Sequence, residues 1–233
     1  MAQLATEMTV APPHAPSRSG NGRRERAPRR SRAATATLDE PLVLSMRPPA
    51  KMTDEQFMAF CAQNRDLRIE RSAEGDLIIM SPVKGDGGIK GAELTRQLAN
   101  WAEADGTGRV FDSSGGFKLP NGAERSPDAA WVSRSRLAAL TPEERERFIP
   151  LCPEFVVELR SSTDGLSTLK NKMKEYMSNG AQLGWLLDPK RRRVYVYRPG
   201  LPEERLDNPA TLAGDPLLPG FVLDVQRVFD ATF

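Results

Sequence analysis

The chain has 233 residues, of which 39% are hydrophobic, a formal net charge of +2 and one histidine, His14. A single histidine excludes Ser-His-Asp hydrolases and histidine-rich metal sites, so catalysis would have to use carboxylates, lysine, tyrosine or an oxygen-bound metal ion. No apolar run approaches the roughly 20 residues of a membrane span. Because an apolar signal segment is also missing at the start, we expect a cytoplasmic protein without membrane contact, in which Cys61 and Cys152 are reduced.

Charge and composition separate the first residues from the rest. Residues 1–37 are rich in Pro, Arg, Ala and Ser and lack periodicity, which predicts a disordered extension before a single domain over residues 38–233. Within residues 1–35, seven arginines face two glutamates, so this part carries +5 and the remainder −3. The remainder is therefore not a generic basic nucleic-acid binder. The arginine run is either a flexible phosphate-binding arm or a solvated extension.

The first predicted elements of the domain are a helix and a hairpin. Thr53 followed by Gln56 predicts a capping box at a helix start. Alternation over residues 67–70 and the apolar run 77–80 predict a β-hairpin. The glycines of residues 85–91 predict a flexible lead into an amphipathic helix, and their spacing does not match a phosphate-binding loop.

The later elements predict a mixed sheet. In chain order they are strands over 115–119 and 128–132 joined by a P-N-G turn, a polar helical stretch over 133–148, a central strand over 155–159, a helix capped by Thr163 or Asp164 and ended by Gly180, strands over 182–188 and 194–197, and a final short helix. Strands flanked by helices in this order predict an α/β or α+β domain.

Two carboxylates in strand positions are the strongest functional signal. Asp128 follows Pro127 at a predicted strand start, and Glu158 lies inside the apolar run F-V-V-E-L. A carboxylate at the margin of a buried strand is costly unless it is paired. A divalent ion is one such partner, and oxygen ligands suit Mg²⁺ or Mn²⁺. The alternatives are a paired strand-end glutamate for Glu158 and a turn or cap role for Asp128.

A lysine would complete the minimal set for phosphodiester hydrolysis. Metal-bound carboxylates activate water, and a lysine orients it or neutralises the developing charge. Lys170, Lys172 and Lys174 all lie on the helix after the central strand. Lys172 lies on one flank of the helix's apolar face and the other two lie on the opposite flank, so periodicity alone does not choose among them.

Several motifs in order carry a family resemblance. P-D-A-A-W-V, V-V-E-L-R-S-S-T-D, K-M-K-E-Y-M-S-N-G, G-W-L-L-D-P and V-Y-V-Y-R-P-G resemble a bacterial family of restriction-endonuclease-like proteins. That family is common in cyanobacteria and actinobacteria, was long catalogued as a domain of unknown function, and belongs to the PD-(D/E)XK nuclease superfamily. The similarity runs from about Met52 to the C-terminus. It implies a restriction-endonuclease-like mixed β-sheet flanked by helices, with an N-terminal hairpin.

The resemblance also implies roles for single residues. Asp128 and Glu158 match the metal-binding carboxylates, and Glu70 matches an acidic residue on the early hairpin that joins the site. The superfamily's lysine usually lies two residues after the second acid, where this chain has Arg160, which cannot act as a base. In the resembled family the next helix supplies the lysine, and Lys172 matches it.

These observations lead to a primary expectation and two alternatives. We expect an endonuclease dependent on Mg²⁺ or Mn²⁺ that cleaves double-stranded DNA, as a possible homodimer by resemblance, with Arg160 and residues 190–193 contacting the substrate. The first alternative is a nuclease-fold nucleic-acid-binding or regulatory protein without useful catalysis. The second is a carboxylate-based hydrolase of small phosphorylated molecules, which would need a closed pocket.

Overall fold

The computed structural model describes residues 41–46, 51–80 and 85–233. The predicted disordered extension over residues 1–37 lies outside the described residues. The described helices are α1 (Asp54–Gln63), α2 (Gly85–Asp105), α3 (Arg134–Ala138), α4 (Pro142–Arg145), α5 (Leu166–Ser178) and α6 (Val225–Asp230), with a 3₁₀ turn η1 (Pro189–Arg191). The described strands are β1 (Leu42–Leu44), β2 (Arg68–Arg71), β3 (Leu77–Met80), β4 (Gly108–Asp112), β5 (Phe117–Lys118), β6 (Glu124–Arg125), β7 (Ala129–Ser133), β8 (Phe155–Leu159), β9 (Leu183–Asp188), β10 (Arg193–Tyr197), β11 (Glu204–Asp207), β12 (Thr211–Ala213) and β13 (Val222–Asp224).

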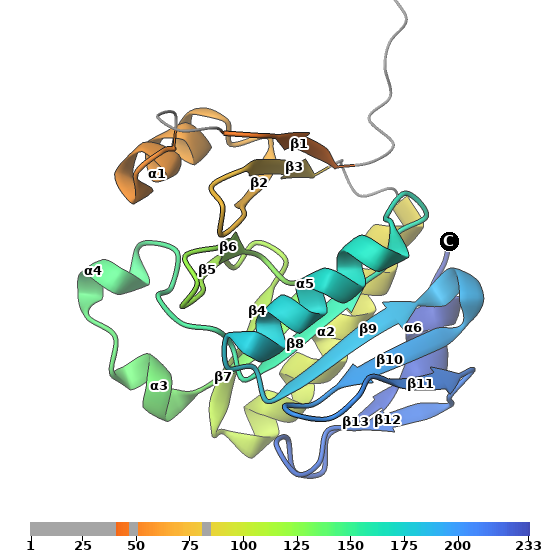
Figure 1. The fold of residues 1–233 in the computed structure, drawn as a ribbon. Helices are drawn as coiled ribbons and strands as arrows, with labels where there is room; N and C mark the ends of the chain where they lie inside the picture. Colours follow the sequence, from red (N-terminus) through yellow and green to blue (C-terminus); the bar gives the residue numbers. More distant parts are fainter. Residues whose placement is uncertain (1–40, 47–50, 81–84) are drawn as a thin grey trace, which may run out of the picture. The chain divides into compact units, whose positions relative to one another are not determined.

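The main sheet has six strands in the order β11-β10-β9-β8-β7-β4. β8 and β9 are parallel and are joined through α5, whereas the other neighbours are antiparallel. α5 covers one face, and α2 with α6 covers the other (Figure 1). Because strand side chains alternate, Val156 packs under α5 and Val157 packs under α2. The centre of the main sheet is thus buried on both faces.

A second sheet of five strands, β1-β3-β2-β6-β5, contains the predicted hairpin as β2 and β3. Its strand β6 is followed directly by β7 of the main sheet. Residues 126–128, the S-P-D of the sequence, form the crossing between the two sheets. This connection places the P-D motif at the junction between the two sheets.

The predicted fold class is confirmed, because a mixed α+β arrangement of sheets and flanking helices is present. The capping box predicted at Thr53 forms, and the structure shows a second capping box at Thr141. None of the described helices is long and apolar enough to cross a membrane. The polar helical stretch over residues 133–148 is present as two short helices, α3 and α4. Two details were wrong: the P-N-G turn joins β5 to β6, and the residue at the N-cap of α5 is Gly165.

The predicted flexible glycine segment is instead the first turns of α2, which begins at Gly85. Contacts from the other end of the chain explain the difference. A Cβ on Gly85 would lie 2.8 Å from the ring of Phe233, and Lys90 Nζ donates a hydrogen bond to the carbonyl of Ala231. Tertiary packing against the C-terminal residues therefore outweighs the low helix propensity of glycine.

Candidate active site

The pairing of β7 with β8 brings the two predicted metal ligands together. Ala129 pairs with Val157 in an antiparallel register. One residue further along this register, Asp128 comes opposite Glu158, and residues directly opposite one another project to the same face of a sheet. The two carboxylates therefore belong to one site, although they are distant in the sequence.

Glu158 lies on the face of the main sheet that α5 covers. Its side chain is 4% exposed, and its Oε1 lies 2.9 Å from Lys172 Nζ. The hydroxyl of Tyr176 donates a hydrogen bond to the same oxygen at 3.1 Å. Because Lys172 and Tyr176 are four residues apart on α5, one face of the helix supplies both donors.

The structure distinguishes the three lysines that periodicity left equivalent. Lys172 contacts two carboxylates, those of Glu158 and Glu70. Lys170 Nζ pairs with Glu203 on the other flank of α5, and the side chain of Lys174 is exposed. Lys172 is therefore the lysine that joins two of the predicted acidic residues, and its catalytic role stays a prediction.

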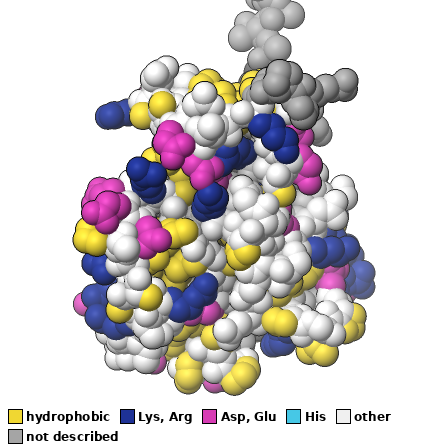
Figure 2. Space-filling view, turned by 60° about the vertical axis from the view of Figure 1, so that its left-hand side comes forward, with side chains coloured by type: hydrophobic (Ala, Val, Ile, Leu, Met, Phe, Trp, Pro, Cys, Tyr) yellow, Lys and Arg dark blue, Asp and Glu magenta, His cyan; other side chains and the backbone are white. Residues whose placement is uncertain are grey.

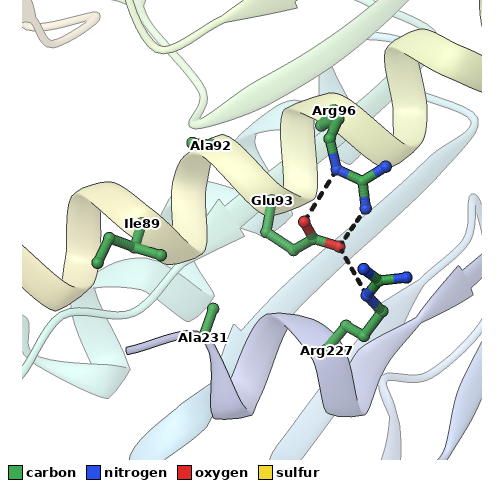
Figure 3. Close-up of a pocket in the computed structure, with 6 residues that line it drawn as sticks. All are labelled: Ile89, Ala92, Glu93, Arg96, Arg227 and Ala231. Carbon is green, nitrogen blue, oxygen red and sulfur yellow. Dashed lines mark hydrogen bonds and ion pairs between the residues drawn. The ribbon is translucent and has the colours of Figure 1, made fainter. Parts of the chain in front are cut away.

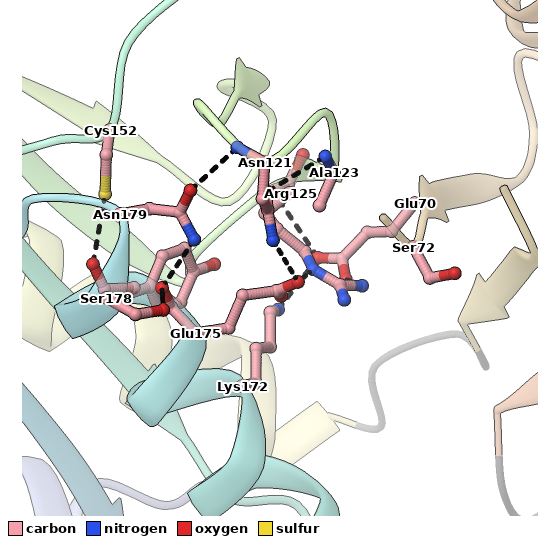
Figure 4. Close-up of polar contacts among 12 residues, drawn as sticks. Glu70, Ser72, Asn121, Ala123, Arg125, Cys152, Lys172, Glu175, Ser178 and Asn179 are labelled. Carbon is pink, nitrogen blue, oxygen red and sulfur yellow. Dashed lines mark hydrogen bonds and ion pairs between the residues drawn. The ribbon is translucent and has the colours of Figure 1, made fainter. Parts of the chain in front are cut away.

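Glu70 on β2 is held by three donors and reaches the site through Lys172. Its Oε1 accepts from Lys172 Nζ at 2.8 Å and from Ser126 N at 3.0 Å. Its Oε2 accepts from Arg125 Nη1 at 3.2 Å, and Arg125 Nε in turn donates to Glu175 at 2.6 Å (Figure 4). Glu70 is thus brought together with the other predicted residues, and its contacts orient the ammonium of Lys172.

Asp128 forms the accessible part of the site. Its Oδ2 accepts from the backbone N–H of Leu159 at 2.8 Å, which ties it to the end of β8. Its Oδ1 lies 3.1 Å from Nη1 of Arg68, and the side chains of Arg68 and Asp128 are 25% and 21% exposed. Solvent and ligands can therefore reach the side chains of Arg68 and Asp128 more readily than those of Glu158 and Lys172.

Burial and charge shift the titration of the inner residues. Burial raises the pKa of Glu158 to about 7 against the opposing effect of Lys172, and the carboxylates of Asp128 and Glu70 add to the rise. Burial alone would lower the pKa of Lys172, but Glu158 and Glu70 outweigh it and hold that pKa above its usual value. Lys172 is therefore an ammonium ion at neutral pH, which suits charge stabilisation better than base catalysis.

The donor set fits a magnesium-like ion held by two carboxylates. Among the described residues, no three acidic, histidine or cysteine side chains are grouped so that they could hold a metal. Mg²⁺ commonly keeps several waters and takes only one or two protein carboxylates together with substrate phosphate. Asp128 and Glu158 match that requirement in the number and type of their ligand groups.

The arginines expected to contact substrate are engaged in ion pairs within the chain. Asp188, which is 1% exposed, lies 2.7 Å from Arg160 and 3.3 Å from Arg191. The other two pairs of this turn are Arg192 with Asp230 and Arg193 with Asp207. The ion pairs of these arginines lie at the end of β9 and the start of β10 and stabilise this turn. Contact of these arginines with substrate stays a prediction. In Figure 2, basic and acidic side chains are interspersed over the visible face.

Two surface hollows are lined by other residues. One lies between α2 and α6, where Glu93 contacts Arg96 at 2.6 Å and Arg227 at 3.5 Å (Figure 3). The other lies beside the second half of α5 and residues 197–203. Neither contains Asp128 or Glu158, so these hollows give no support to a small-molecule hydrolase built on the two carboxylates.

Sequence reasoning missed two arginines that complete the charge balance of the site. Arg68 pairs with Asp128, and Arg125 pairs with Glu70. Arg68 was detectable in principle, because alternation along R-I-E-R places it on the same face as Glu70. Arg125 had no local signal, because its partner lies on a different strand of the second sheet.

Comparisons with known proteins identify a family and a fold. A family model, Uma2, described as "Putative restriction endonuclease", matches residues 54–226. A crystal structure described as a putative nuclease belonging to DUF820, from Anabaena variabilis, is similar with a TM-score of 0.61 and 21% sequence identity. The likeness covers 76% of this chain and 97% of that one, and it concerns the fold. A search of curated proteins found no match. With the family model spanning the hairpin, both carboxylates and the helix that carries Lys172, the chain belongs to the Uma2 family.

Proposed function

We propose that this protein is a metal-dependent endonuclease that hydrolyses phosphodiester bonds in DNA, with Asp128 and Glu158 holding Mg²⁺ or Mn²⁺. The observation that carries the proposal is the juxtaposition of Asp128 and Glu158 across β7 and β8, with the Lys172 ammonium 2.9 Å from Glu158. Two carboxylates and a cation at one partly exposed place are what metal-assisted hydrolysis of a phosphodiester requires. Membership of a family described as "Putative restriction endonuclease" supports the same reaction class.

Each residue has a distinct part in this proposal. A bound divalent ion supplies an activated water and offsets charge on the phosphate oxygens. Asp128 is kept in place by the N–H of Leu159, so one of its oxygens is positioned by the backbone of β8. Lys172, charged and oriented by Glu70, is placed to neutralise the developing negative charge or to position the water. Tyr176 is hydrogen-bonded to Glu158 and fixes the orientation of that carboxylate.

Plasmid cleavage by the full chain tests the assignment. Supercoiled DNA is incubated with the protein and Mg²⁺ or Mn²⁺, with and without EDTA. We expect cleavage that EDTA abolishes and that Asp128→Asn and Glu158→Gln each reduce by about a hundredfold or more. Asp66→Asn removes an exposed carboxylate of the same type and is expected to retain cleavage. Retained cleavage in Asp128→Asn would refute the ligand assignment.

One observation favours the alternative of a nuclease-fold binding protein. Asp128 is paired with Arg68, and both Glu70 and Glu158 are paired with Lys172, so each of the three acids already has a side-chain cation as a neighbour. Calorimetric titration with Mg²⁺ and Mn²⁺ separates the two functions. Binding of about one or two ions, lost in Asp128→Asn, supports the nuclease. No heat at millimolar metal, combined with measurable DNA binding, supports the binding protein.

We also propose double-stranded DNA as the substrate and a homodimer as the working unit. The charge of −3 outside the first 35 residues argues against binding by overall charge, so local contacts have to supply affinity. Parallel assays on duplex DNA, single-stranded DNA and RNA identify the substrate. Size-exclusion chromatography with light scattering identifies the oligomeric state, and a monomer at working concentration would remove the dimer from the proposal.

A further inference from the structure

We propose that Arg68 is a two-position residue of this site: it competes with the metal ion for Asp128 and, once displaced, binds the scissile phosphate. This inference rests on the proposed nuclease function and adds a residue that the two-carboxylate and lysine assignment leaves out. In this proposal, Arg68 opposes metal binding while it is paired with Asp128. Once the metal ion has taken Asp128, the displaced Arg68 is free to bind the substrate phosphate.

The position of Arg68 follows from the two sheets. Arg68 begins β2, two residues before Glu70, so both side chains leave the same face of the strand. Residues 126–128, which connect β6 to β7, lie against the guanidinium of Arg68. There its Nη1 lies 3.1 Å from Asp128 Oδ1, and its Nη2 donates to the carbonyl of Ser126. The guanidinium therefore already binds Asp128 Oδ1, an oxygen that would be needed to hold the metal ion.

The contacts of Arg68 are incomplete for a purely structural residue. Its Nε is buried and has no hydrogen-bond partner among the described residues. Its side chain is nevertheless 25% exposed, in contrast to 9% for Lys172 and 2% for Glu70. An unsatisfied buried N–H is unfavourable, and a rearranged position in which Nε donates to an acceptor would relieve it. A phosphate oxygen is an acceptor of the required kind.

The electrostatic surroundings explain why the residue remains in the site after displacement. The guanidinium of Arg68 contacts Asp128, and its side chain leaves the same face of β2 as Glu70, which shares Lys172 with Glu158. A positive charge that is attracted by three acids does not leave for solvent when one of them takes a metal ion. Arginine also matches phosphate with a planar fork of donors, which lysine lacks. Arg68 is therefore suited to hold a phosphate beside the ion.

The test compares Arg68→Met, which keeps length but removes charge and donors, with wild-type protein. Calorimetry with Mn²⁺ in the absence of DNA is expected to show roughly tenfold tighter binding, because the charged hydrogen bond that opposes the metal is gone. Single-turnover cleavage of duplex DNA at saturating Mn²⁺ is expected to be about a hundredfold slower, because the phosphate loses its arginine. The two parameters thus move in opposite directions.

Two further variants control this comparison. Arg65→Met removes an exposed arginine three residues earlier in the chain and is expected to change neither parameter. Arg68→Lys keeps the charge without the fork and is expected to keep the wild-type Mn²⁺ affinity with intermediate cleavage. Thermal unfolding in EDTA checks that each variant is folded.

The outcomes separate this inference from the proposed function. Metal binding and cleavage in the wild type with unchanged or weaker Mn²⁺ affinity in a folded Arg68→Met would overturn the role of Arg68 and leave the nuclease intact. Tighter Mn²⁺ binding with undiminished cleavage would overturn the phosphate contact. Absence of Mn²⁺ binding in both proteins would overturn the nuclease proposal and this inference together. Binding that appears only in Arg68→Met would support the competition directly.

Discussion

At the scale of single residues, the buried carboxylate of Glu158 links pH to both stability and activity. Its pKa in the folded protein is about 7, above the ordinary value of 4.5. Between these pH values, Glu158 holds a proton in the folded protein but has released it in the unfolded chain. The contribution of this proton to the stability of the folded protein is therefore complete below pH 4.5 and is lost as the pH rises through 7. Metal binding requires the deprotonated form and is favoured in the opposite direction.

We therefore predict opposite pH trends for stability and cleavage. The temperature midpoint of unfolding in EDTA is expected to decrease as the pH is raised from about 5 to about 8. Glu158→Gln is expected to make this decrease smaller, because glutamine cannot ionise. Cleavage is expected to rise over the same interval. Scanning calorimetry and initial rates across pH measure the two trends. An unfolding midpoint with the same pH dependence in Glu158→Gln would show that another group is responsible.

Lys172 provides a second prediction at this scale. Lys172→Met leaves Glu70 and Glu158 without their shared cation, and breaking a buried ion pair in this way costs about 3–5 kcal/mol. We expect the lower end of that range, because Glu158 can take up a proton instead. Lys174→Met, an exposed substitution two residues away, is the matched control and is expected to be near neutral. Urea denaturation at pH 7 measures both. Equal stability of the two variants would mean that Lys172 does not neutralise the pair.

At the scale of elements, the position of the site depends on how β4, β7 and β8 pack. Gly108 starts β4 and pairs with Ser133 on β7. A Cβ at Gly108 would lie 2.2–2.5 Å from ring atoms of Trp131, whose side chain is packed against α2. A rigid ring cannot yield as a flexible side chain does, so the strand pair has no room for a methyl group at this position.

We predict that Gly108→Ala destabilises the protein by about 1–3 kcal/mol through overpacking. Gly88→Ala is the control, because its Cβ would meet nothing within 4 Å and alanine favours the helix, so a gain of up to about 1 kcal/mol is expected. Denaturant unfolding with an unchanged slope measures both. A neutral Gly108→Ala would show that Trp131 moves readily.

At the scale of the whole molecule, binding of the metal is coupled to folding. Asp128 and Glu158 come from different strands and are adjacent only in the folded protein, so an ion that binds both favours the folded state. Ion binding at a concentration a hundredfold above its dissociation constant adds about 2.7 kcal/mol to the free energy of unfolding.

We therefore predict that millimolar Mn²⁺ raises the midpoint of thermal unfolding and that EDTA reverses the rise. The shift is expected to disappear in Asp128→Asn and to persist in the exposed control Asp66→Asn. Differential scanning fluorimetry across a Mn²⁺ titration measures it. An equal shift in Asp128→Asn would place the responsible metal elsewhere in the chain.

The sequence by itself determined the features that depend on neighbouring residues. One histidine excluded whole classes of catalyst, the capping box at Thr53 set a helix start, and alternation over residues 67–70 predicted a strand of the β-hairpin. These signals survive because capping and alternation act over a few residues.

Only the tertiary structure decided the features that depend on residues far apart in the chain. It distinguished Lys172 from its neighbours, brought Arg68 and Arg125 to the acids, and started α2 at Gly85 against the C-terminal residues. The physical reason is that charge pairing and packing depend on distance in space. The crossing from β6 to β7, which brings the two sheets together at Asp128, leaves no periodic trace in the sequence.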